Sequence, residues 1–135
     1  RPPATARQAG GEPARAAPPY RGARDVQRRV RRTPHFSTAV MLVGLGELLA
    51  GQKRLAQAEP LLREALDQAD RALPPGHWRR GEVQSALGAC LWRQGRRDEA
   101  RPLLVSGHDV LRRTLGDAHP ATRRARTRLD SAQGR

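Results

Sequence analysis

The chain has 135 residues, a net charge of +13 and only 3% aromatic residues, and 37% of its residues are apolar. This composition argues against one thick core and favours thin layers that each bury a little surface against the next. The single cysteine excludes a disulfide framework. No stretch is apolar enough for a signal peptide or a bilayer span, so we expect a cytoplasmic protein without membrane contact.

The first 33 residues divide into two predicted segments. Residues 1–15 are rich in Arg, Pro and Gly, which predicts disorder. Residues 16–33 are predicted to be a degenerate second helix of a preceding repeat, because several of their residues recur 42 positions later. The recurring residues Ala16, Pro18, Arg21 and Ala23 fall in register with Ala58, Pro60, Arg63 and Ala65.

Residues 34–75 are predicted to form a first complete repeat of two helices. The first helix covers 36–50, where Met41, Leu42, Leu45, Leu48 and Leu49 recur at steps of three and four, the spacing of one buried helix face. Gly51 is expected to end it. The second helix covers about 56–72 and carries Pro60 in its first turn, where the missing N–H costs nothing.

Residues 76–117 repeat this pattern. Leu45-Gly46 falls on Leu87-Gly88, and Pro60-Leu61-Leu62 falls on Pro102-Leu103-Leu104. We therefore expect helices at about 77–93 and 98–115, and a capping helix within 118–135, at about 119–131, with Asp117 as its cap. The predicted fold class is all-α, with antiparallel helix pairs stacked as a short superhelical solenoid.

Small and aromatic residues in the repeat have predicted packing roles. Gly46, Gly88, Ala58 and Ala100 are expected to let paired helices approach closely, with both alanines buried at the helix crossings. Trp78 follows the turn between the repeats and is expected to pack between them.

The repeated motif resembles the tetratricopeptide repeat (TPR). Its two copies are Leu42-x-x-Leu45-Gly46-x-x-Leu49 with Ala58-x-x-x-Leu62, and Gln84-x-x-Leu87-Gly88-x-x-Leu91 with Ala100-x-x-x-Leu104. The period of 42 is similar to the repeats of kinesin light chains, and residues 86–122 resemble the C-terminal repeats of bacterial serine/threonine protein kinases. The resemblance covers about residues 34–131 and implies a TPR-type solenoid that binds a protein or peptide partner.

The family's arrangement implies a concave groove lined by the first helix of each repeat. We expect the ligand to be polar and charged, because the residues at groove positions include both acids and bases. The predicted partner-binding residues are Glu47, Glu82, Ser85, Ala89, Trp92, Arg93, Arg124 and Arg128.

Two alternatives place the chain in another functional class. It could be the regulatory C-terminal tail of a bacterial serine/threonine kinase or of a transcriptional regulator, which the sequence of the full-length gene would settle. It could also bind nucleic acid nonspecifically, although we expect the many arginines to reflect composition. The arginines concerned are Arg28, Arg29, Arg31, Arg32, Arg123, Arg124, Arg126 and Arg128.

Signals that resemble catalytic or metal sites have simpler explanations. Gly44-x-Gly46 lacks the third glycine, the lysine and the strand of a phosphate loop. Histidines recur every 42 residues, at His35, His77 and His119. Equivalent positions of stacked helices lie about 10 Å apart, which is too far for the three side chains to share one metal ion. Each histidine is therefore expected to shape a helix start or a turn. Cys90 is expected to be a buried, inert thiol. We therefore expect no enzyme activity, no cofactor and no metal in this chain, and the sequence does not indicate its oligomeric state.

Overall fold

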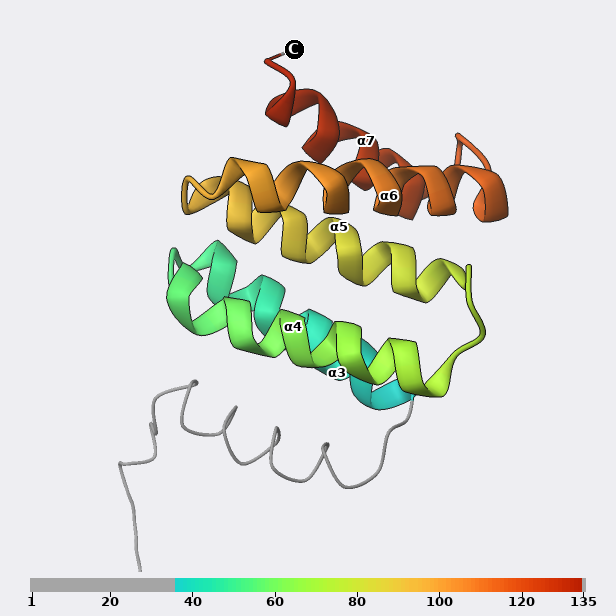
Figure 1. Cartoon of the computed structure of the whole chain (residues 1–135), viewed down its shortest axis with the longest axis horizontal. Helices are drawn as coiled ribbons and strands as arrows, with labels where there is room; N and C mark the ends of the chain where they lie inside the picture. The colour runs from blue at the N-terminus through green and yellow to red at the C-terminus, as the bar shows by residue number, and fades with distance from the viewer. Residues whose placement is uncertain (1–35, 135) are drawn as a thin grey trace, which may run out of the picture.

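The computed structural model describes residues 36–134, and within this range it contains five helices and no strand. They are α3 (Phe36–Gly51), α4 (Leu55–Ala72), α5 (Trp78–Arg93), α6 (Arg97–Leu115) and α7 (Pro120–Ala132). Helix α3 pairs with α4 and α5 pairs with α6, and the helices stack in chain order towards the C-terminus (Figure 1). The predicted all-α fold is confirmed. The segments predicted at 1–15 and 16–33 lie outside the described residues.

The same tight turn joins the two helices of each repeat. The backbone N–H of Arg54 donates to the Leu49 carbonyl at 2.9 Å, and that of Arg96 donates to the Leu91 carbonyl at 3.0 Å. The turn requires a positive φ, which Gly95 adopts at 85° and Lys53 at 65° in the equivalent position. Helix α3 ends at Gly51, as predicted, whereas the left-handed residue of the turn is Lys53.

Histidines cap two of the first helices. The Nδ1 atom of His77 accepts a hydrogen bond from the backbone N–H of Arg79 at 3.1 Å, and Nδ1 of His119 accepts one from Ala121 at 3.0 Å. Both histidines have φ −67° and ψ 138°, so the repeat reproduces the cap geometry. The expected role at helix starts is thus confirmed for His77 and His119, whereas Asp117 as the cap of the last helix is wrong.

Small residues set the distance between paired helices. A Cβ atom on Gly46 would lie 2.7 Å from the Leu62 side chain, and one on Gly88 would lie 2.9 Å from Leu104. Ala58 and Ala100 are fully buried, which confirms their predicted burial. Both repeats therefore depend on the absence of side-chain volume where their two helices meet.

The core runs through all five helices. Leucines 42, 49, 61, 62, 87, 91 and 104 form its main part, and a smaller cluster of Leu111, Ala121 and Ala125 lies between α6 and α7. Trp78 packs against this smaller cluster, which lies between α6 and α7, and not between the two complete repeats as predicted. The prediction that Met41 and Leu48 share the buried face of α3 is wrong, because they are 50% and 54% exposed. They lie on the side of α3 that the other described helices leave open.

An ion-pair network joins the repeats at the α4–α5–α6 corner. Arg96 contacts Glu59 at 2.6 Å and Glu99 at 2.8 Å, and Arg63 contacts Glu59 at 2.7 Å. Burial would raise the pKa of Glu59, but hydrogen bonds from Arg63 and Gln94 and the charges of Arg63 and Arg96 outweigh it and lower this pKa. The carboxylate is therefore stabilised in its charged form, and it fixes the turn before α6 to the preceding repeat.

Candidate partner-binding surface

The first helices of successive repeats, α3, α5 and α7, contact one another in that order, and α4 and α6 cover their other side. In Figure 1, α4 and α6 lie nearer to the viewer than α3 and α7. We use the term first-helix face for the surface formed by Glu47, Glu82, Arg124 and Arg128. Ser85, which was predicted to bind the partner, is buried beneath this face at 1% exposure. Glu82 and Ser85 share one side of α5, as do Arg124 and Arg128 of α7, because residues three or four apart align on a helix.

Arg128 connects the three first helices. Its guanidinium donates to the Glu47 carboxylate at 2.7 Å and to the Ser85 hydroxyl at 3.1 Å. Glu47 lies 81 residues earlier in the chain, which is the largest sequence separation of any hydrogen bond between side chains of the described residues. The Arg128 side chain is only 25% exposed, and the forked donor is therefore held in one orientation across the stack.

A second charged group lies near the start of α5. Glu82 accepts from Arg79 at 3.1 Å, on its own helix, and its other carboxylate oxygen lies 3.5 Å from Arg124 of α7. The side chain of Glu82 is 19% exposed, whereas that of Arg124 is 57% exposed. The charge of Glu82 is thus largely neutralised by Arg79 of the same helix, whereas the guanidinium of Arg124 remains mostly exposed to solvent.

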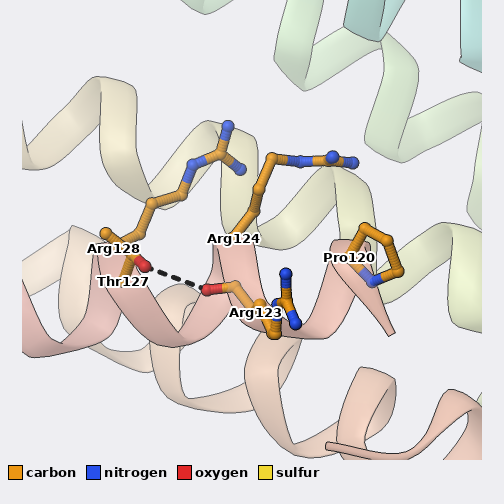
Figure 2. Close-up of a pocket in the computed structure, with 5 residues that line it drawn as sticks. All are labelled: Pro120, Arg123, Arg124, Thr127 and Arg128. Atoms are coloured by element: carbon orange, nitrogen blue, oxygen red, sulfur yellow. Dashed lines mark hydrogen bonds between the residues drawn. The ribbon is translucent and has the colours of Figure 1, made fainter. Parts of the chain in front are cut away.

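A shallow hollow of about 400 Å³ lies on α7 beside these pairs. Figure 2 shows its lining residues, and Arg124 and Arg128 extend from α7 on the side where they meet Glu82 and Ser85 of α5. The Thr127 hydroxyl donates to the Arg123 carbonyl at 3.0 Å, as the dashed line in Figure 2 marks. Among the described residues, no carboxylate pairs with the exposed Arg123 side chain. The hollow therefore has a positive wall.

The remaining predicted residues lie on α5. Ala89 and Trp92 are partly buried and pack against the main core, and Arg93 is exposed. The Trp92 ring is covered from α6, with the guanidinium carbon of Arg97 4.7 Å and that of Arg101 5.8 Å from its centre. The structure thus brings Glu47, Glu82, Ser85, Arg124 and Arg128 together, while the recorded ring contacts of Trp92 come from the second helix of its repeat.

Several residues of this surface were not predicted. Arg79, which holds Glu82, could have been found from its position three residues earlier on the same helix. Pro120 and Thr127 of the hollow carried no signal in the sequence. Arg123 was assigned to the nucleic-acid alternative and not to the groove, and its register equivalent is Gly81.

The described residues contain few groups suited to catalysis or metal binding. Cys90 is buried, and its thiol lies 3.5 Å from the Leu55 carbonyl. Burial raises the pKa of this thiol, so it stays protonated at neutral pH, as expected of an inert core cysteine. No cluster of three potential metal ligands occurs between residues 36 and 134. In the same range, no helix has the length and apolar character needed to cross a membrane.

Comparison with known proteins agrees with this geometry. The family model described as tetratricopeptide repeat matches residues 38–79 and again residues 81–121. The two matches follow one another with the spacing of the helix pairs α3–α4 and α5–α6. No curated protein matches the chain.

Proposed function

Because the chain belongs to the tetratricopeptide-repeat family, we propose that its first-helix face binds an acidic segment of a partner protein. Repeats of this family generally mediate protein–protein interaction, and their helical fold typically carries no catalysis. Side chains aligned on three adjacent helices suit an extended or helical peptide, which contacts them one after another.

The observation that carries this proposal is the charge balance of the face. Its two carboxylates, Glu47 and Glu82, already have arginine partners at 2.7 Å and 3.1 Å. Arg124 is mostly exposed at 3.5 Å from Glu82, and Arg123, which lines the hollow beside the face, has no carboxylate partner among the described residues. The face therefore has cations available and no available anion, which favours a ligand with carboxylates.

The arrangement also lowers the entropic cost of binding. Arg128 is fixed by Glu47 and Ser85, and Glu82 is fixed by Arg79. A partner that meets a preorganised surface loses less affinity to the ordering of side chains. Arginine in particular can bind a carboxylate with two parallel hydrogen bonds.

The test is the affinity of the full chain for a fluorescent peptide of glutamates, measured by anisotropy and compared with a peptide of lysines of equal length. We expect the glutamate peptide alone to bind. The double substitution Arg123→Ser and Arg124→Ser should weaken binding about 2- to 30-fold, because each exposed pair contributes about 0.2–1 kcal/mol and 1.4 kcal/mol corresponds to tenfold.

The matched control removes the same charge from another helix. Arg112 and Arg113 of α6 are exposed and pair with Asp109 of their own helix. Arg112→Ser with Arg113→Ser should leave the affinity within about twofold, because both residues lie on α6, which covers the other side of the first helices. An equal loss in both double variants would mean that only net charge matters, and equal binding of both peptides would refute the proposal.

The two alternatives from the sequence stay predictions. A kinase or regulator domain encoded upstream would support the regulatory-tail hypothesis and would not alter the surface described above. For the nucleic-acid hypothesis, Arg124, Arg126 and Arg128 each have a carboxylate partner, at 3.5, 3.7 and 2.7 Å. We expect binding to DNA or RNA to be weak and lost at moderate salt, and tight sequence-specific binding would overturn this ranking.

A further inference from the structure

Two arginines of α6 lie over the ring of Trp92. The guanidinium carbon of Arg97 is 4.7 Å and that of Arg101 is 5.8 Å from the ring centre, both within the range of a cation–π contact. Both arginines are exposed and lie four residues apart on the helix, so two cations are held together over one aromatic ring. We call these three residues the tryptophan patch.

The two cations of the patch have no carboxylate partner between residues 36 and 134. The other tryptophan differs in this respect. Arg79 lies over the ring of Trp78 at 4.1 Å, but it also pairs with Glu82 at 3.1 Å. Like charges four residues apart on a helix repel each other, so an anion that bound both arginines of the patch would remove an unfavourable interaction.

The repeat register shows that the patch reverses the charge of a position that the first repeat uses for contact. Arg101 occupies the position of Glu59, which accepts from Gln94 at 3.1 Å and from Arg96 at 2.6 Å. Both donors belong to the turn that follows α5. A carboxylate thus meets donors at this position in the first repeat, whereas the second repeat places a guanidinium there. A group that binds Arg101 has to supply acceptors instead, which an anion does.

We propose that the tryptophan patch binds the phosphate group of a phosphorylated serine or threonine in a partner protein. A guanidinium that lies over a ring keeps its in-plane N–H donors free, and these bind phosphate oxygens in pairs. A phosphate monoester carries nearly two negative charges and three acceptor oxygens, so it matches two arginines better than a single carboxylate does. This site at the start of α6 goes beyond the acidic segment proposed for the first-helix face and does not depend on it.

The environment of the ring favours a phosphate carried by a protein over one carried by nucleic acid. Single strands are bound largely through bases that stack on open aromatic faces. The Trp92 ring is partly buried against the main core, and Arg97 and Arg101 cover it from α6. The ring therefore holds the two guanidiniums in place and leaves little surface for a base.

The neighbouring charges leave the patch positive. Asp98 lies between the two arginines in the sequence and lines a hollow of about 690 Å³ on α6 together with Arg101, but the two form no ion pair. Glu99 is already paired with Arg96 at 2.8 Å. Arg93 at the end of α5 is exposed and offsets the charge of Asp98. Asp98 is thus the one carboxylate that opposes an anion here, among the residues that the structure describes in this turn of α6.

The test is the affinity of the full chain for a fluorescent phosphoserine peptide of otherwise neutral residues, measured by anisotropy. We expect it to bind at least about tenfold more tightly than its unphosphorylated form, because hydrogen bonds to charged groups are the strong ones. Arg97→Ser with Arg101→Ser should lower the affinity to that of the unphosphorylated peptide. Asp98→Asn should raise it, since a repelling charge is removed.

The matched control removes the same charge from the same helix. Arg112 and Arg113 begin about 16 Å further along α6 than Arg101, beyond the range of unscreened charge, so Arg112→Ser with Arg113→Ser should change the affinity less than about twofold. NMR of the unaltered chain gives a second readout. The phosphopeptide should shift the indole N–H signal of Trp92 and leave that of Trp78 unchanged.

Several results would overturn the proposal. They are an equal loss of affinity in both double variants, equal binding of the phosphorylated and unphosphorylated peptides, or a shift at Trp78 alone. Inorganic phosphate that competes as well as the peptide would show that the patch takes free phosphate, and tighter binding of a thymidine oligonucleotide would show that it takes nucleic acid. Arg123→Ser with Arg124→Ser should leave phosphopeptide binding unchanged, so this proposal and that for the first-helix face can fail separately.

Discussion

The closest approach between helices α5 and α6 gives a quantitative prediction. A Cβ atom on Gly107 would lie 2.6 Å from the Gly81 carbonyl oxygen and 2.9 Å from the Ser85 backbone nitrogen. Both are backbone atoms of α5, so no side chain can rotate away and the helices themselves would have to separate. Gly107→Ala should thus strain the pairing, although alanine is the better helix former.

The two effects have opposite signs, and their sizes decide the result. Overpacking of this kind costs about 1–3 kcal/mol, and the gain in helix propensity from Gly to Ala is about 1 kcal/mol. For a rigid backbone contact the upper part of the first range applies, which leaves a net loss of about 1–2 kcal/mol. For a domain of about 100 residues, this corresponds to a fall in Tm of roughly 4–16 °C.

The matched control is Gly44→Ala in the middle of α3. An added Cβ atom there meets nothing within 4 Å, so only the propensity gain applies. We expect it to raise the free energy of unfolding by about 0.5–1 kcal/mol, measured by thermal melting followed by circular dichroism. If Gly107→Ala were as stabilising as Gly44→Ala, the helix crossing at Gly81 and Gly107 would not be as close as described.

Three further predictions concern the repeat, its caps and its ion pairs. Ala100→Leu adds three heavy atoms at a fully buried position and should reduce the free energy of unfolding by about 1–3 kcal/mol, and an unchanged melt would contradict the packing. His119→Ala removes the acceptor for the Ala121 N–H and should cost about 0.5–1 kcal/mol, with faster amide exchange confined to the start of α7. Because folding lowers the pKa of Glu59, this carboxylate stabilises the folded state at pH values above its usual pKa of 4.5. That stabilisation is lost as the pH falls through the lower pKa of the folded state. Glu59→Gln should therefore flatten the dependence of Tm on pH below about 4.5, and an unchanged slope would argue against this carboxylate as a source of acid sensitivity.

The helices could be predicted closely because their determinants are local. The repeated leucines and alanines, Pro60 and the turns after Leu49 and Leu91 placed the predicted bounds within about two residues of those observed. The errors arose where local signals compete. Helix α3 does end at Gly51, but the positive φ of the turn lies at Lys53 and not at a glycine. Asp117 was a reasonable cap, but His119 takes that role through the geometry it shares with His77.

The candidate surface could be predicted only in part. The repeat register identifies which residues lie on first helices, and Glu82 and Arg124, which share one register position, lie 3.5 Å apart. It does not describe the reach of a long side chain. Arg128 occupies the register position of the buried Ala86, yet its guanidinium extends to Ser85 and to Glu47 two repeats earlier. The exposure of Met41 and Leu48 depends on what covers α3, which periodicity alone does not indicate.

The central claim, that an acidic partner segment binds across α3, α5 and α7, is tested most directly by mapping where such a segment lies. The measurement is the change in backbone amide NMR shifts of the full chain on addition of the glutamate peptide. We predict the largest changes around Glu82 and Ser85 of α5 and between Arg123 and Arg128 of α7, with little change at Arg112 and Arg113 of α6. Changes concentrated on α4 and α6 would place the ligand on the opposite side of the repeats and would contradict the account.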